Sequence, residues 1–243
     1  MPTPNPLYLF YVACMALGAL LFFIWSRNPK GVHREEYLVA SLIPIWSGLA
    51  YLAMAYGLGQ TEVAGQTTYW ARYADWIVTT PLLILALALT ANHRKQERNG
   101  VLIGAAIAAD VIMILCGLIA DLVEYAFLRY VFFFIGVAAL VAVFYITWGP
   151  FRRTAYSEGQ DLGKLYDRVA GYLSIFWIGY PTVWFLGPSG INVLPQSIDT
   201  WLFILLPLFS KVGFSILDLY LLRQLSPTAA SNPAVEAKPV GAV

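Results

Sequence analysis

The stretch QSIDTWLFILLPLFSKVGFSILDLYLLR, residues 196–223, decides the fold of this chain. It is apolar over a greater length than the roughly 20 residues that a helix needs to cross about 30 Å of hydrocarbon. One lysine, Lys211, lies near its middle, roughly 20 Å from either end at a rise of about 1.5 Å per residue. Its ammonium group cannot extend to water from that depth, so the amine must be paired with a carboxylate or be neutral.

Six further apolar stretches of similar length precede this one. The chain is 59% hydrophobic and has a mean hydropathy of +0.67, which excludes an ordinary soluble domain. We predict an all-α membrane protein, a bundle of seven transmembrane helices, and read the first stretch as a span because it is too long for a signal peptide and has no cationic segment before it. The predicted spans lie near residues 6–26, 36–57, 69–91, 101–120, 125–147, 169–188 and 196–223.

Basic residues are concentrated in three of the six predicted loops, those after spans one, three and five. By the positive-inside rule these loops face the cytoplasm, which places the N-terminus outside and the C-terminus inside a plasma membrane. Residues 1–225 form the transmembrane domain, and residues 226–243, rich in Ala, Pro and Ser, are predicted to be a disordered cytoplasmic tail. The basic loop residues are Arg27, Lys30, Arg34, Arg94, Lys95, Arg98, Arg152, Arg153, Lys164 and Arg168.

Ionisable residues inside the spans are costly unless they are paired or hydrated, which marks them as candidate functional residues. Arg72 and Asp75 are three residues apart and Thr79 follows four residues later, so the three share one face of the third helix. A buried carboxylate at Asp75 needs a cation, which a protonated imine on Lys211 would supply. The alternatives are a static Arg72–Asp75 ion pair, and a lysine that is only structural.

Two more acids lie within the spans. Asp218 is seven residues beyond Lys211, on the same helix face and roughly 10 Å further toward the predicted cytoplasmic side. Asp110 lies in the fourth span, where an interhelical hydrogen bond is favoured over a role in proton transfer.

Aromatic residues surround the same depth, on the third and sixth helices. Such residues usually serve packing or the interface belt, but their coincidence with a buried lysine favours a flat, conjugated ligand held between rings. They are Tyr73, Trp76, Trp177, Tyr180 and Trp184, accompanied by Pro181.

Three motifs resemble those of the microbial (type 1) rhodopsins: RYADWIVTTPLL at 72–83, WIGYPTVW at 177–184 and FSKVGF at 209–214. The resemblance extends from the first helix to Arg223. It implies all-trans retinal bound covalently to Lys211 as a protonated Schiff base, with Asp75 as counterion, Thr79 hydrogen-bonded to it, and Tyr51 and Arg72 nearby. It further implies a retinal pocket that is formed by Trp76, Thr80, Leu83, Met113, Gly117, Phe133, Trp177, Tyr180, Pro181, Trp184 and Pro207.

The sequence departs from the outward proton pumps of this family at two positions. Pro207 stands where those pumps carry a second counterion, and Ala86 stands where they carry a cytoplasmic proton donor. Asp75 argues against a chloride pump, and the Asn-Asp-Gln set of sodium pumps is absent. Pro207, Asp218 and the Trp46-Ser47-Gly48 segment are similar to the xenorhodopsin group, which includes the Anabaena-type sensory rhodopsin. Some members pair the cytoplasmic aspartate with a histidine on helix two, where this chain has Trp46; its two histidines, His33 and His93, lie in predicted cytoplasmic loops.

The resemblance implies a light-driven inward proton pump. Asp218 would accept the proton, Glu36 would release it to the cytoplasm, and Asp75 would be supplied from outside past Arg72 and Asp199. The alternatives are a photochromic sensor that signals to a soluble transducer, and a retinal-free carrier or receptor that would leave Lys211 unexplained. Partners are expected to be the lipid bilayer, protons and, by family resemblance, two further copies in a trimer; no enzyme activity, metal or nucleic acid is expected.

Overall fold

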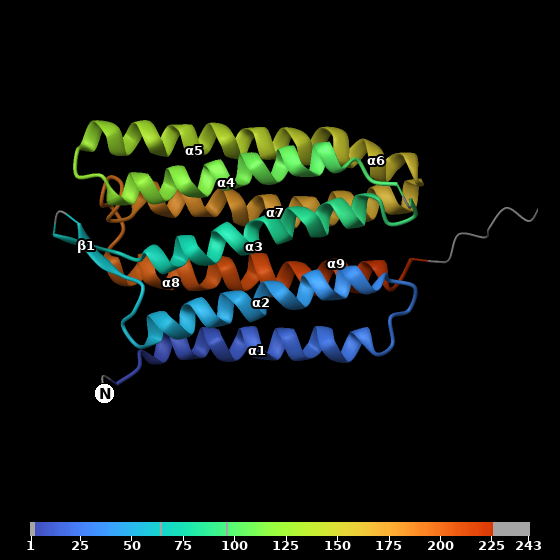
Figure 1. The fold of residues 1–243 in the computed structure, drawn as a ribbon, viewed down its shortest axis with the longest axis horizontal. Coiled ribbons are helices and arrows are strands. Elements are labelled where there is room, and N and C mark those ends of the chain that lie inside the picture. Colours follow the sequence, from blue (N-terminus) through green and yellow to red (C-terminus); the bar gives the residue numbers. More distant parts are fainter. Residues whose placement is uncertain (1–2, 64, 96, 226–243) are drawn as a thin grey trace, which may run out of the picture.

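The computed structural model describes residues 3–63, 65–95 and 97–225, and within them seven helical spans run side by side as one bundle (Figure 1). The predicted all-α, seven-span architecture is confirmed, and the predicted disordered tail lies outside the described residues. The first four spans are α1 (Pro6–Ser26), α2 (Arg34–Ala55), α3 (Trp70–Ala91) and α4 (Gly100–Leu122). The fifth joins α5 (Ala126–Ile146), η1 (Thr147–Phe151) and α6 (Arg152–Ser157); the sixth is α7 (Gln160–Leu186); the seventh joins α8 (Gln196–Pro207), η2 (Leu208–Gly213) and α9 (Phe214–Leu222).

The bundle has two distinct ends. At the end that we call the hairpin end, strands β1 (Thr61–Val63) and β2 (Gln66–Thr68) pair antiparallel between α2 and α3, with Thr61 opposite Thr68. The opposite end, which we call the basic end, carries the connections 27–33, 92–99 and 158–159. The first described residues lie at the hairpin end and residue 225 at the basic end (Figure 1).

Burial differs between the helices as expected for a bundle surrounded by lipid. Helix α3 lies in the interior, with 67% of its most apolar window buried, whereas only 22% of that of α4 is buried. Large apolar side chains such as Leu17, Phe23 and Phe134 are exposed on the outside of the bundle. In a bilayer these side chains contact lipid tails, so their exposure carries no hydrophobic penalty.

The connection between spans five and six is shorter than predicted. Span five continues to Ser157 and span six begins at Gln160, whereas the sequence predicted a loop from 148 to 168. Hydropathy marks only the apolar part of a helix, and here polar turns continue both helices beyond it. Ion pairs hold these turns: Arg152 Nε lies 2.7 Å from Asp167 Oδ1, and Arg94 Nη2 lies 2.5 Å from Asp161 Oδ2.

Two spans contain a π-helical segment beside a proline. Pro150 lies inside η1, and Pro207 is the last residue of α8, immediately before η2. Proline has no N–H to donate and its ring clashes with the preceding turn, so the local hydrogen-bond pattern must change. In η2 the wide turn contains Lys211, and such turns occur often at functional positions.

Candidate functional site

The Lys211 amine is fully enclosed and lies against a carboxylate of another helix. Both Lys211 and Asp75 are 0% exposed. The lysine Nζ donates a hydrogen bond to Asp75 Oδ2 and another, of 2.9 Å, to Ser47 Oγ. The expected pairing of this lysine with the acid of α3 is therefore present, and Asp75 supplies the negative charge that a cation at position 211 requires.

Hydroxyl groups from three helices orient the Asp75 carboxylate. Ser47 Oγ donates to Asp75 Oδ2 at 2.9 Å, and Thr79 Oγ1 lies 3.3 Å from Oδ1 and 2.9 Å from the Asp75 carbonyl oxygen. The Tyr11 hydroxyl lies 2.6 Å from Ser47 Oγ. Because the single Ser47 proton is used toward Asp75, Tyr11 is the donor in that contact.

Sequence reasoning found Thr79 and missed Tyr11 and Ser47. Thr79 lies one turn from Asp75 on the same helix, so its contact follows from spacing. Ser47 was noted only within a resemblance, and nothing in the apolar first span distinguishes Tyr11 from a packing residue. Their contacts depend on how α1 and α2 pack against α3, which spacing within one helix does not reveal.

Arg72 lies toward the hairpin end and does not pair with Asp75. Its Nη1 is 3.6 Å from Asp199 Oδ2, and its guanidinium stacks over the rings of Tyr69 and Phe203 at 4.5 and 4.7 Å. The alternative of a static Arg72–Asp75 ion pair is wrong, because Lys211 takes the carboxylate. Arg72 Nε and Nη2 are buried without a partner among the described residues, which leaves donors for water.

Tyr51 lies close to the hydrogen bonds around Asp75 but does not itself bind the Asp75 carboxylate among the described contacts. Its hydroxyl donates to the Phe203 carbonyl oxygen at 2.8 Å, and its ring packs against that of Tyr11 with centroids 4.0 Å apart. It therefore supports Tyr11 and connects α2 to α8.

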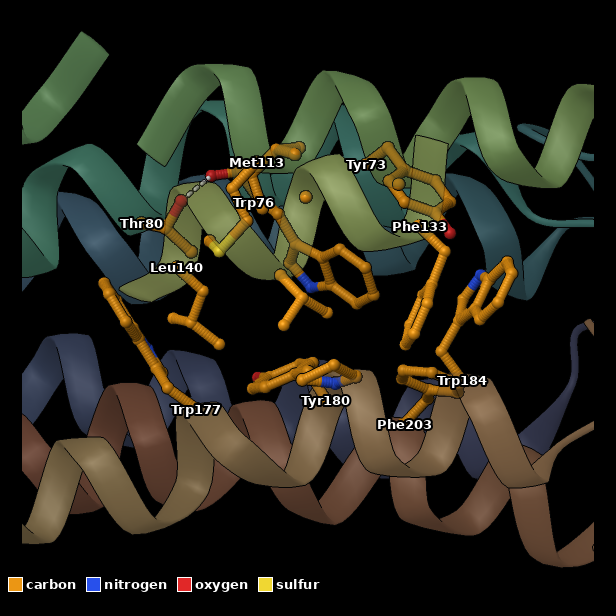
Figure 2. Close-up of a pocket in the computed structure, with 15 residues that line it drawn as sticks. Tyr73, Trp76, Thr80, Met113, Phe133, Leu140, Trp177, Tyr180, Trp184 and Phe203 are labelled. Atoms are coloured by element: carbon orange, nitrogen blue, oxygen red, sulfur yellow. Dashed lines mark hydrogen bonds between the residues drawn. The ribbon is translucent and has the colours of Figure 1, made fainter. Parts of the chain in front are cut away.

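An apolar cavity lies between α3, α4, α5, α7 and α8 (Figure 2). Trp177 stands at one side of the view and Trp184 with Phe203 at the other, while Trp76 and Tyr180 lie between them. Most residues predicted for a retinal pocket line it: Trp76, Thr80, Met113, Gly117, Phe133, Trp177, Tyr180, Pro181 and Trp184.

Three predicted pocket residues are not part of this lining, and five others were missed. Leu83 is packed in the core, Pro207 is buried within the seventh span, and Tyr51 faces Tyr11. Residues 133, 136, 137 and 140 share one face of α5, so the spacing from Phe133 could have indicated three of the missed ones. Tyr73, predicted only as one of the aromatic residues at this depth, also lines the cavity; the missed residues are Ile114, Gly136, Val137, Leu140 and Phe203.

The residues around the cavity fit a flat, apolar, conjugated chain. Trp76 and Tyr180 meet edge to face with centroids 5.2 Å apart, and Phe133 stacks on Trp184 at 4.6 Å. The Thr80 hydroxyl donates to Asp110 Oδ2 at 2.7 Å and is therefore satisfied outside the cavity. The Tyr180 hydroxyl lies 3.0 Å from the hydroxyl of Ser210, the neighbour of Lys211 in the chain, so this wall of the cavity contacts the turn that carries the lysine.

Two further acids tie the cavity walls together. The Thr80–Asp110 bond joins α3 to α4, which is the interhelical role expected of Asp110. Asp121 was not predicted: it accepts from the Tyr73 hydroxyl at 2.7 Å and from Trp184 Nε1 at 2.8 Å. Sequence reasoning assigned Asp121 to a turn, whereas it lies in the last turn of α4 and joins three helices.

Asp218 and Glu36 lie on the basic side of Lys211, and both are 4% exposed. Thr90 Oγ1 donates to Asp218 Oδ1 at 2.8 Å, and His93 Nδ1 lies 2.8 Å from Glu36 Oε1. Thr90 lies in the last turn of α3 and His93 in the turn that follows it, so the partners of both acids come from one short segment. The sequence predicted the two acids, but it assigned His93 to a loop without a role.

Comparison with known proteins identifies the family. The model of the bacteriorhodopsin-like protein family matches residues 3–225. Archaerhodopsin-3 of Halorubrum sodomense is 35% identical over 229 residues, 92% of this chain and 86% of that protein. The thermophilic rhodopsin from Rubrobacter xylanophilus has a similar structure, with a TM-score of 0.83, 35% identity and coverage of 88% of this chain and 94% of that one.

A second solved structure is described as a light-driven proton pump, the Coccomyxa subellipsoidea rhodopsin. It has a TM-score of 0.80 and 28% identity, and the match covers 88% of this chain and 94% of that one. The family match, the buried Lys211 and the aromatic cavity beside it agree with one another. The chain therefore belongs to the bacteriorhodopsin-like family of microbial rhodopsins, retinal-binding proteins that span the plasma membrane.

Proposed function

We propose that this protein is a light-driven inward proton pump of the xenorhodopsin type, with its basic end in the cytoplasm. The observation that carries the proposal is the placement of acids along the seventh span. Asp75 is the carboxylate in contact with Lys211, and the next acid on the lysine's own helix, Asp218, lies buried toward the basic end. Positions 207 and 86, where outward pumps of the family carry acids, hold Pro207 and Ala86.

Lys211 would hold retinal within the aromatic cavity, and the bound group would supply light absorption and a light-driven isomerisation beside the lysine nitrogen. In the dark, Asp75 fixes that proton by charge, and Ser47 with Tyr11 holds the carboxylate in place. Transport needs an acceptor on one side of the nitrogen and a donor on the other, with access switched between them.

The acceptor side is formed by Asp218 and the residues after it. The Asp218 carboxyl receives the proton while Thr90 holds its Oδ1. Glu36 then releases the proton to water at the basic end, where His93 holds its Oε1. Their partners, Thr90 at the end of α3 and His93 just after it, are three residues apart, which supports a route from Asp218 to Glu36.

The supply side is formed by the polar groups at the hairpin end. Arg72 and Asp199 lie together there, and unpartnered Arg72 nitrogens are available to order water. Protons reach the Lys211 nitrogen from this side through the groups around Asp75. Net movement is then from the outside to the cytoplasm.

The sign of a light-induced pH change tests this function. Cells that express the pigment are suspended in unbuffered medium and illuminated, with and without a protonophore. We expect the medium to become alkaline in the light and the change to vanish with the protonophore. Acidification that is sensitive to the protonophore would show an outward pump and contradict the proposal.

A photosensor is the second candidate, favoured by the extensions of the spans at the basic end. The first turns of α7 carry Asp161, which pairs with Arg94, and Asp167, which pairs with Arg152 of α6. These groups offer a charged surface to a soluble transducer. Light-dependent capture of a soluble protein from native membranes, together with no transport in vesicles, would support the sensor instead of the pump.

A further inference from the structure

A cluster of three ligand groups lies at the basic end of the bundle. The connection before α2 contributes His33, α2 contributes Glu36, and the turn after α3 contributes His93. Glu36 Oε1 is 2.8 Å from His93 Nδ1 and 3.7 Å from His33 Nδ1, and the three ligand atoms all lie within 4.8 Å of one another. The sequence predicted no metal site, and His33 and His93 are far apart in the chain, so only the fold brings them together.

We propose that His33, Glu36 and His93 form a binding site for a divalent transition-metal ion of the zinc class. Two imidazoles with one carboxylate are a common zinc ligand set that leaves a fourth position for water. Calcium and magnesium prefer sites made entirely of oxygen, so this ligand set disfavours them.

Only small movements of the three side chains are needed to bind a zinc ion. Zinc–ligand distances of about 2.0–2.2 Å place tetrahedral ligands roughly 3.3 Å apart, and the contacts of Glu36 Oε1 already lie on either side of that value. The His33 side chain is 49% exposed and can turn toward the other two ligands, and it also gives the ion an entrance from water.

An independent observation points into the same cluster. Glu36 Oε2 is buried and has no hydrogen-bond partner among the described residues, and an unsatisfied carboxylate oxygen of this kind is costly. A bound cation would satisfy it. Arg34, Lys95 and Arg98 line a neighbouring groove and oppose a cation, and the pairing of Arg98 with Glu35 offsets one of these three charges.

The site has a consequence that depends on the proposed function. Glu36 is the proposed proton-release group, so a metal ion on its carboxylate would occupy the exit. Zinc would then slow the last, proton-releasing phase of the photocycle. The metal site itself does not depend on the direction of transport.

Zinc titration of the purified pigment tests the site by calorimetry. The chain contains two histidines, so the affinity tag must not contain histidine. We expect one zinc ion per chain, and at least about tenfold weaker binding in His33→Ala and in His93→Ala, since even outer-shell changes cost about that much. Glu62→Gln is the matched control: it removes an exposed carboxylate at the opposite, hairpin end of the bundle and should change the affinity less than about threefold. Visible absorption shows that each variant is folded.

The outcomes separate the site from the proposed function. Absence of zinc binding, or binding that both histidine variants leave unchanged, overturns the site. Flash photolysis then tests the coupling: zinc should slow the last phase in the parent protein but not in His33→Ala, and no slowing at saturating zinc overturns the coupling. If zinc binds as expected while illuminated cells show no inward transport, the proposed pump fails and the metal site stands.

Discussion

The two sides of Lys211 differ sharply in polarity. Toward the hairpin end the lysine contacts Asp75 and Ser47, and Arg72 with Asp199 follows on the same side. Toward the basic end, large apolar side chains occupy the next turns before Asp218 is reached, together with Ser215, whose buried hydroxyl has no partner among the described residues. The comparison shows that the polar contacts of the lysine nitrogen lie on one side and that the other side is mainly apolar.

Three side chains lie on the mainly apolar side, and we call them the apolar layer: Ile43, Leu83 and Phe214. Ile43 is one turn from Ser47, Leu83 one turn from Thr79, and Phe214 one turn from Lys211, each toward the basic end. All three are 0% exposed. On the proposed inward route, a proton would pass this layer to reach Asp218, and Ser215 is the buried polar residue one turn from Lys211 at the same level.

Removing the lysine should have the largest effect, because both sides of the comparison are defined by their contacts with this residue. Lys211→Ala, regenerated with all-trans retinal, should show no visible absorption band, since no other described residue offers an amine at the cavity. Lys164→Ala, on the polar first part of α7, is the control and should keep the full band. A normal spectrum in the Lys211 variant would end this account.

The second prediction removes Asp75, the carboxylate that contacts Lys211 on the polar side. Asp75→Asn leaves a buried cation without its partner, a change that costs about 3–5 kcal/mol. The nitrogen should therefore lose its proton at neutral pH, and the pigment band should move to the near ultraviolet. Absorption spectra measure this shift, and Ser47→Ala, which removes one hydrogen bond worth about 1 kcal/mol, should shift the band much less. A visible band that Asp75→Asn leaves in place would contradict the assigned pairing.

Opening the apolar layer should reduce the contrast between the two sides. Leu83→Ala removes a fully buried side chain and should lower the free energy of unfolding by about 2–5 kcal/mol. It should also admit water and speed proton arrival at Asp218 in flash photolysis. Leu82→Ala, which is less buried on the same helix, is the control. An unchanged or slower proton arrival in Leu83→Ala would argue against a dry barrier at this level.

The sequence predicted the functional residues within single helices better than the contacts between helices. Hydropathy and helical spacing were enough to find Lys211, Asp75, Thr79 and Asp218. The free-energy cost of a charge in a membrane span and the periodicity of a helix can both be read from a single segment of the chain. The apolar layer and the Tyr11–Ser47 contact join different helices, so they depend on packing that no single span reveals. The π-helical turn at Lys211 likewise follows from Pro207 only once the neighbouring helices are in place.

The smallest effect is expected at the Thr80–Asp110 hydrogen bond, in the wall of the cavity between α3 and α4. Thr80→Val removes the hydrogen bond to Asp110 and leaves that buried carboxyl less satisfied, at a cost of about 1–3 kcal/mol. Thermal unfolding should occur at a lower temperature, while the transport direction stays the same. Thr182→Val is the control, because its exposed hydroxyl bonds only its own helix among the described contacts. A change in transport direction would show that Asp110 takes part in proton transfer.

Time-resolved infrared spectroscopy of the illuminated pigment tests the central claim, that the proton leaves Lys211 toward the basic end. We predict that a protonated-carboxyl band appears as the nitrogen loses its proton, and that this band is absent in Asp218→Asn and present in Asp110→Asn. A band that persists in Asp218→Asn and disappears in Asp75→Asn would show that the proton leaves toward the hairpin end, which contradicts the account.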